Sequence, residues 1–191
     1  EAWLWEHLAL VRARVVAGPS DLAADIAGLR QRVLSEVRDV RSVMGDLRDM
    51  RARIAAAKAP AGVWDVKVGA GRMQDIELFS QTGALLSATA PRDVADGIAG
   101  CVAAGLTSDA QAQVLQDTYA MLWRIQMAVR LLSTDRLDAD ALGSRGLDVL
   151  IAATQEPTRA QAEAALAAAY IAARDVIDSA VARHAGVGAG G

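Results

Sequence analysis

The sequence predicts an all-α protein, a multi-helix bundle of about six to eight helices with at most one short extended segment near residue 65. Hydrophobic residues make up 53% of the chain but aromatic residues only 4%, so its apolar content is mainly alanine, valine and leucine. Alanine has the highest helix propensity, whereas strands favour β-branched and aromatic residues. In addition, apolar residues recur at spacings of three and four, and only four prolines interrupt them. These observations favour packed helices over a sheet.

The first part of the chain contains three predicted helices. The first ends at Gly18-Pro19, and its start inside a helical pattern suggests that the sequence was cut from something longer. Ser20 or Asp21 can cap the second helix, and the third starts at Asp39 or Arg41. The third has one apolar side and one basic side, the latter with Arg41, Arg48, Arg51 and Lys58. The residues that recur on one face of the three predicted helices are, in order, Trp3, Leu4, His7, Leu8, Val11 and Val15; Leu22, Ile26, Leu29, Val33 and Leu34; and Val43, Leu47, Met50 and Ile54.

The remaining helices follow a break at residues 59–62, Ala-Pro-Ala-Gly. Residues 63–71 are predicted to be extended chain or loop, and helices follow at about 72–88, from Pro91 to Gly105, from Ser108, at 147–153 and from Thr158. Pro91 fits the first turn of its helix, and Ser108 with Gln111 has the form of a capping box. We therefore expect one helical domain over residues 1–185 and a disordered tail over 186–191.

Composition excludes several classes of protein. The net charge is -3, with 20 basic residues spread among 23 acidic ones, and no basic stripe indicates nucleic-acid binding. No uncharged apolar run approaches the roughly 20 residues that span a bilayer, and the N-terminus lacks the basic region of a signal peptide. The single cysteine, Cys101, cannot form an internal disulfide and fits a reducing, cytoplasmic location. We interpret it as a small core residue.

The most informative stretch runs from Trp64 to Gln81, where charged residues, glycines and apolar residues alternate. Asp75 and Glu77 resemble a paired carboxylate site, but positions two apart on a helix point roughly 200° apart, so the two cannot easily bind one metal. Glu77 and Gln81 are four apart and share a face, and Lys67 could return to meet Asp75 or Glu77. Two interpretations remain: a structural ion pair that fastens the loop to the helix, or a polar cluster that faces a ligand cleft or a neighbouring domain.

Other possible sites have simpler explanations. Gly69-Ala70-Gly71 precedes a helix but lacks the third glycine of a dinucleotide-binding loop, so turn-making glycines are the better interpretation. Asp138-Ala139-Asp140 has the form of a two-metal motif, yet it follows a long helix, where capping and solvation explain it. The two histidines and one cysteine make no set of metal ligands, and no catalytic triad is visible, so we predict no catalytic and no metal-binding residues.

Three blocks resemble the glutamine synthetase adenylyltransferases over residues 1 to about 90. The family has a W/F-D-x-K segment, a glycine pair and a D-I-E-F-x-x-Q helix; here these are Trp64-Asp-Val-Lys67, Gly69 and Gly71, and Asp75-Ile-Glu-Leu-Phe-Ser-Gln81. Residues 5–18 are similar to its W-E-x-x-A-L-x-R-A-R-x-V-A-G helix, and residues 49–54 to its D-M-R-x-R-I stretch. The sequence departs from the pattern in two places: Arg72-Met73 stands where the family has a glycine and an aliphatic residue, and Leu78 replaces an aromatic residue. Arg72 argues against close approach of a ligand to the glycine pair.

The resemblance implies a role within a bifunctional enzyme that attaches AMP to a tyrosine of glutamine synthetase and removes it. The Asp-Ile-Glu form indicates the C-terminal, adenylylating half, in the helical region after the nucleotidyltransferase core that carries the metal-binding aspartates. ATP and Mg²⁺ are then implied for the full-length enzyme, and none is expected to be held by this chain alone, with Lys67, Asp75, Glu77 and Gln81 as candidate nucleotide-binding residues. The implied partners are the upstream core, glutamine synthetase and the PII signalling protein. The alternatives are a non-catalytic helical interaction module and the helical part of a PII uridylyltransferase-like enzyme.

Overall fold

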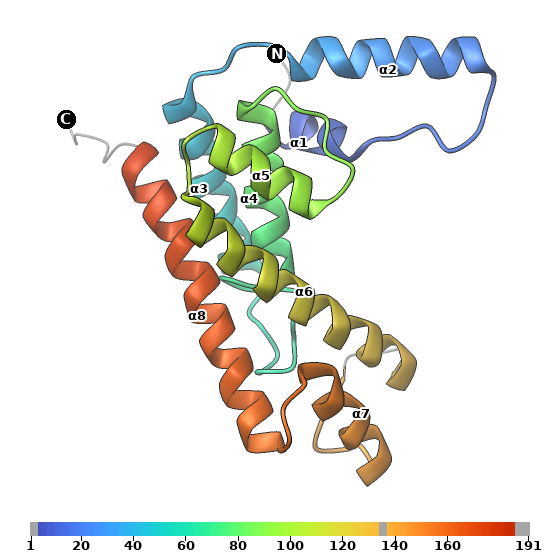
Figure 1. The fold of residues 1–191 in the computed structure, drawn as a ribbon, viewed down its shortest axis with the longest axis vertical. Coiled ribbons are helices and arrows are strands. Elements are labelled where there is room, and N and C mark those ends of the chain that lie inside the picture. Colours follow the sequence, from blue (N-terminus) through green and yellow to red (C-terminus); the bar gives the residue numbers. More distant parts are fainter. Residues whose placement is uncertain (1–3, 134–136, 186–191) are drawn as a thin grey trace. The chain divides into compact units, whose positions relative to one another are not determined.

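The structure, a computed structural model, describes residues 4–133 and 137–185 and contains eight helices and no strand within those ranges (Figure 1). The helices are α1 (Leu4–Arg12), α2 (Ser20–Leu34), α3 (Val40–Ala57), α4 (Met73–Leu86), α5 (Val94–Ala103), α6 (Asp109–Leu132), α7 (Ser144–Thr154) and α8 (Arg159–His184). The predicted all-α class is confirmed. Residues 63–71 form turns rather than a strand, and the predicted disordered tail, 186–191, lies outside the described residues.

The chain divides into two compact units, which we describe separately. Unit 1 comprises Glu1–Met50, Glu77–Ala112 and Asp178–Gly191, and unit 2 comprises Arg51–Ile76 and Gln113–Ile177. None of the described helices is both long and apolar enough to cross a membrane.

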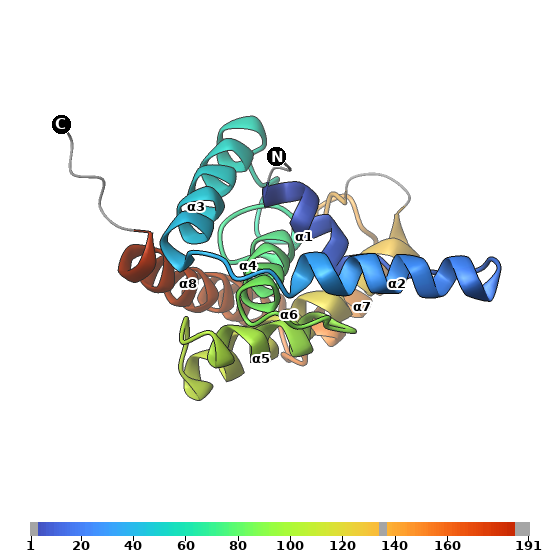
Figure 2. The ribbon, with the colours of Figure 1, turned by 90° about the horizontal axis from the view of Figure 1, so that it is seen from above.

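In unit 1, α1 lies beside α2 (Figure 2), and Arg30 joins them by donating to the carbonyls of Leu10 (2.9 Å) and Val11 (2.6 Å). The α1 helix ends at Arg12, earlier than the predicted end at Gly18-Pro19. The carbonyls of Leu10 and Val11 accept hydrogen bonds from Arg30. They accept none from the amides of Arg14 and Val15, which would be their partners if the helix continued. Leu8 and Val11 are buried against residues that include Leu34, Ala84 and Leu85.

Two predicted helix starts were wrong in unit 1. Pro19 occupies the N-cap of α2, and its side chain has no oxygen that could accept a capping hydrogen bond. Ser20 and Asp21 lie inside the helix and do not cap it. Asp93 caps α5 by accepting from the amide of Asp96 at 2.9 Å, so Pro91 precedes the helix instead of lying in its first turn. By contrast, the reciprocal capping box of α6 is confirmed, with Ser108 N–H donating to Gln111 Oε1 (3.0 Å) and Gln111 N–H to Ser108 Oγ (3.3 Å).

Glycines bring α4 and α5 into backbone contact in unit 1. A Cβ on Gly83 would lie 2.3 Å from Cys101 Sγ, and a Cβ on Gly97 would lie 2.8 Å from the Ser80 carbonyl oxygen. Cys101 is fully buried, and its thiol donates to the Phe79 carbonyl (3.4 Å). Burial raises the pKa of Cys101 to about 12. The cysteine is therefore the core residue that the sequence predicted.

Unit 2 contains α7, the main parts of α6 and α8, and the loop before α4. Its buried apolar residues include Leu115, Leu122, Ile125, Leu150, Leu166 and Ile177. Arg124 links α6 to α7, which lie next to each other in Figure 1, by donating to the Ala153 carbonyl at 3.3 Å. Thr158 caps α8 as predicted, accepting from the Gln161 amide at 3.3 Å.

Candidate functional site

The stretch that the sequence singled out forms a closely bonded loop in unit 2, here called the junction loop (residues 58–72). The Asp65 carboxylate accepts from the amides of Ala61 (3.0 Å) and Lys67 (3.3 Å), which closes the first turn. The next segment returns to α4, where the amides of Met73 and Gln74 donate to the carbonyls of Val66 (3.1 Å) and Lys67 (3.0 Å). The loop thus satisfies first-turn amides that a helix leaves without an internal partner.

Arg72 fastens the junction loop from inside. It is buried, and its Nη1 donates to the carbonyls of Gly62 (2.9 Å) and Asp65. The guanidinium carbon lies 4.2 Å from the centre of the Tyr170 ring on α8, a cation–π contact. Tyr170 in turn donates its hydroxyl to the Val63 carbonyl (2.9 Å), and burial raises its pKa. Arg72, which appeared in the sequence only as a departure from a family pattern, is a central structural residue.

Gly71 is the point where the loop meets the backbone of α8. Its φ is +70°, and a Cβ there would lie 2.0 Å from the Tyr170 carbonyl oxygen and 2.9 Å from the Arg174 amide nitrogen. Gly69 also has a positive φ, +128°. The glycine pair therefore makes turns, as predicted, and at Gly71 the missing side chain makes room for another helix.

Asp75 is the best-satisfied carboxylate in this region. Its Oδ1 accepts from Arg51 Nε at 2.6 Å, and its Oδ2 accepts from Arg51 Nη2 at 3.0 Å and from the Gly71 amide at 2.8 Å. The Asp75 and Arg51 side chains are only 7% and 15% exposed. This is a bidentate, buried ion pair, the strong form of such an interaction. The predicted kind of contact is present, but its cation is Arg51 instead of Lys67.

Arg51 was missed because its helix position suggested the solvated side of α3. The pair joins residues 24 positions apart, and no local spacing rule identifies such a partner. Lys67 contributes backbone groups to the loop, while its side chain is exposed.

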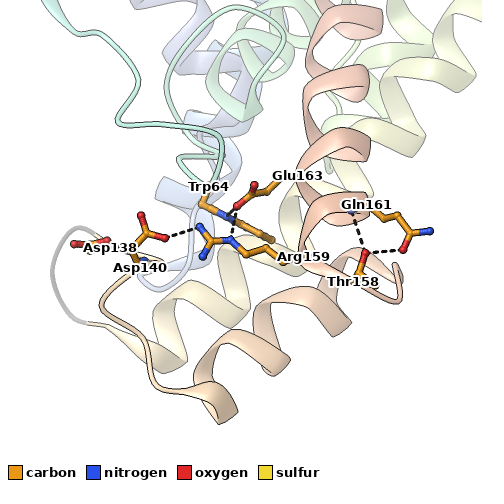
Figure 3. Close-up of polar contacts among 7 residues, drawn as sticks. All are labelled: Trp64, Asp138, Asp140, Thr158, Arg159, Gln161 and Glu163. Atoms are coloured by element: carbon orange, nitrogen blue, oxygen red, sulfur yellow. Dashed lines mark hydrogen bonds and ion pairs between the residues drawn. The ribbon is translucent and has the colours of Figure 1, made fainter.

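A second polar cluster connects the junction loop to α8 and to the segment before α7 (Figure 3). Glu163 Oε1 accepts from Trp64 Nε1 (2.9 Å) and from Arg159 Nε (2.7 Å), and Arg159 Nη2 reaches Asp140 at 2.6 Å. Hydrogen bonds donated by Arg159 and, to a smaller extent, by Trp64 hold the pKa of the Glu163 carboxyl below its usual value. The hydrogen bonds that Arg159 donates to Glu163 and Asp140 raise the pKa of Arg159. The cluster anchors the Trp64 of the motif.

The Asp138-Ala139-Asp140 triplet is part of this cluster. The Asp140 amide donates to Asp138 Oδ1 at 3.0 Å, which makes a turn, and the Asp140 carboxylate pairs with Arg159. Both side chains are exposed, in agreement with the predicted solvation, but neither caps a helix, because the N-cap of α7 is Gly143. Across residues 4–133 and 137–185, no group of three or more His, Cys, Asp and Glu side chains is arranged to hold a metal ion.

Glu77 and Gln81 belong to unit 1. The Glu77 carboxylate lies 3.9 Å from Arg12 Nη1, and Gln81 is buried in α4. Lys67 and Asp75 belong to unit 2. A nucleotide-binding role for any of these four residues stays a prediction.

A family model described as GlnD PII-uridylyltransferase matches residues 47–182, from the second half of α3 almost to the end of α8. The chain belongs to this family. The GlnD family match covers the junction loop, the Arg51–Asp75 pair and the cluster around Glu163, and it leaves out α1 and α2.

Curated relatives of this GlnD family chain carry the name bifunctional glutamine synthetase adenylyltransferase/adenylyl-removing enzyme. One from Rhodopseudomonas palustris is 32% identical over 162 residues, 82% of this chain and 16% of the relative. One from Xanthobacter autotrophicus is 34% identical over 161 residues, 82% and 16%, and one from a Bradyrhizobium species is 33% identical over 171 residues, 87% and 17%. The resemblance inferred from the three sequence blocks is confirmed. The chain spans about one sixth of the length of the relatives it matches.

Proposed function

We propose that this chain is the helical region of a glutamine synthetase adenylyltransferase, in the adenylylating half, next to a nucleotidyltransferase core of the same polypeptide. In that enzyme AMP passes from ATP to a tyrosine of glutamine synthetase. The helical region supports the nucleotide cleft or docks partners, and the core performs the chemistry. The names of the relatives, at 32% to 34% identity over most of this chain, support the reaction class.

One observation carries the structural role: the side chains of Asp75, Trp64 and Arg72 are engaged inside unit 2. Asp75 receives three hydrogen bonds, Trp64 is bonded to Glu163, and Arg72 closes the loop. A general base or a metal ligand needs a lone pair directed at the substrate or ion, and the two Asp75 oxygens point at Arg51 and Gly71 instead. Asp75 therefore does not fit a Mg²⁺ site, and ATP with Mg²⁺ belongs to the proposed core.

Lys67 is the motif side chain left for a ligand. The bonded loop holds its backbone while the ammonium group remains exposed. We assign it to an anionic group, such as an ATP phosphate, in the complete enzyme. The test compares Lys67→Ala with Lys58→Ala, an exposed lysine of the same loop, in the longer polypeptide. A higher KM for ATP in Lys67→Ala alone supports the assignment, and unchanged kinetics in both variants refutes it.

A second candidate activity comes from the family description, which names PII uridylyltransferase. Transfer assays on the longer polypeptide separate the two, with labelled ATP and glutamine synthetase in one arm and labelled UTP and PII protein in the other. Label on glutamine synthetase supports our proposal, and label on PII alone overturns it. Titration calorimetry of this chain with glutamine synthetase and with PII tests docking, and no heat with either removes the docking role. A cytoplasmic location follows from these partners and stays part of the proposal.

A further inference from the structure

Helix α6 carries an exposed apolar stripe, Trp123, Met127 and Leu131, at successive spacings of four on one face. These side chains are between 40% and 82% exposed. Tryptophan and methionine are enriched in protein interfaces, and isolated exposed apolar residues do not usually align in this way. The α6 stripe therefore has the composition of a docking surface.

The charge beside the α6 stripe is positive. Arg124 and Arg130 lie on the same face, and no acidic residue occurs between Thr118 and Leu132. Arg124 donates to the Ala153 carbonyl and to Gln155 Oε1 at 3.3 and 3.5 Å, both uncharged acceptors, so its charge is not neutralised by them. An occupant of this surface would need apolar residues at helical spacing with carboxylates beside them.

Helix α2 has that chemistry. Leu22, Ile26 and Leu29 are between 42% and 53% exposed, and Asp21 and Asp25 are exposed beside them. We propose that the α2 stripe of one copy of this chain packs on the α6 stripe of a second copy. The proposal goes beyond the function proposed above and does not depend on it.

The apolar stripes can pack with the two helices antiparallel. Leu22, Ile26 and Leu29 then face Leu131, Met127 and Trp123 in order. At 100° per residue, Asp25 and Arg130 lie on the same side of this contact and at nearly the same level along the helices. With the helices parallel, Asp25 would instead lie beside Arg124, so the response to Arg130→Asp tests the antiparallel direction. A contact of one helix with another is small for an interface, so we expect a dissociation constant on the order of 10 µM.

The test uses the intact chain and measures its mass by sedimentation velocity over a concentration series. Wild type is expected to associate, and Asp25→Arg or Arg130→Asp alone to associate about tenfold more weakly, because each places like charges together. An equal mixture of the two variants should recover wild-type association, because each contact between different variants pairs either two original or two reversed charges. Asp46→Arg and Arg41→Asp, exposed on α3, are the matched controls.

Folding is monitored separately, by circular dichroism of each variant. Ile26→Asp provides a second disruption, at a position that is 42% exposed. A wild-type chain that stays monomeric at hundreds of micromolar, or variants whose mixture does not recover association, overturns the proposal.

Discussion

Replacement of Gly71 by alanine tests the idea that this glycine exists to admit the backbone of α8. Its φ of +70° disfavours a side chain, a cost of about 1 kcal/mol. In addition, a Cβ would lie 2.0 Å from the Tyr170 carbonyl oxygen, so the backbones must separate by about 1 Å to reach the 3.0 Å below which real contacts do not occur. Overpacking of this kind costs about 1–3 kcal/mol. The sum is about 2–4 kcal/mol.

Gly105 provides the matched control, because its φ is +72° and no heavy atom lies within 4 Å of a Cβ built there. Gly105→Ala therefore carries the backbone cost alone, about 1 kcal/mol. The measurement is the free energy of unfolding from urea titration followed by far-ultraviolet circular dichroism. Equal losses in the two variants would show that α8 does not limit the space at Gly71 and would refute the reasoning.

Three further results are expected from the same unit-by-unit description. Asp75→Asn should lower the free energy of unfolding by about 3 kcal/mol, because it leaves Arg51 without its buried carboxylate. The control Asp46→Asn, at an exposed position, should change the free energy of unfolding little. A loss below about 1 kcal/mol for Asp75→Asn would contradict the buried-pair interpretation. Because the pKa of Glu163 is lowered by folding, its stabilisation is complete above pH ~4.3, the usual glutamate pKa, and is lost as the pH falls through the lowered value. Glu163→Gln should therefore be less stable than wild type at pH 7, by less than about 1 kcal/mol for this partly exposed group. In urea titrations the difference should shrink as the pH falls below the usual glutamate pKa, and a gap that grows on acidification would contradict the sign. The buried Cys101, with its pKa near 12, should react with a thiol reagent at pH 8 only after urea unfolds the chain, and rapid labelling of the native protein would show that unit 1 opens at this position.

The helices could be predicted because their signals are local. The Ser108–Gln111 capping box and the Thr158 cap lie within one turn of the helices they start, and both are present. The end of α1 could not be predicted, because Arg30, from another helix, takes the carbonyl groups near its last turn.

The sequence singled out the stretch that forms the junction loop, but it did not predict which residues its side chains contact. The sequence identified Asp75 and the structural alternative for it, yet assigned the pairing to the nearby Lys67 instead of Arg51. Arg72 was noticed only as an exception to a pattern. Its role depends on Tyr170, whose contact with the loop arises from the packing of α8, and helical spacing alone does not contain that information.

The attachment of the junction loop to α8 has a consequence for the order of folding. Trp64 and Val63 form hydrogen bonds with residues 99 and 107 positions later in the chain, so the loop cannot acquire these contacts until synthesis has passed Glu163 and Tyr170. Contacts of such long range form slowly, because the intervening chain must first be confined. Residues 61–72 should thus remain open to proteases on a nascent chain after α3 and α4 have formed. They would close only when Tyr170 leaves the ribosome, which makes α8 the last component needed to complete a motif encoded more than ninety residues earlier.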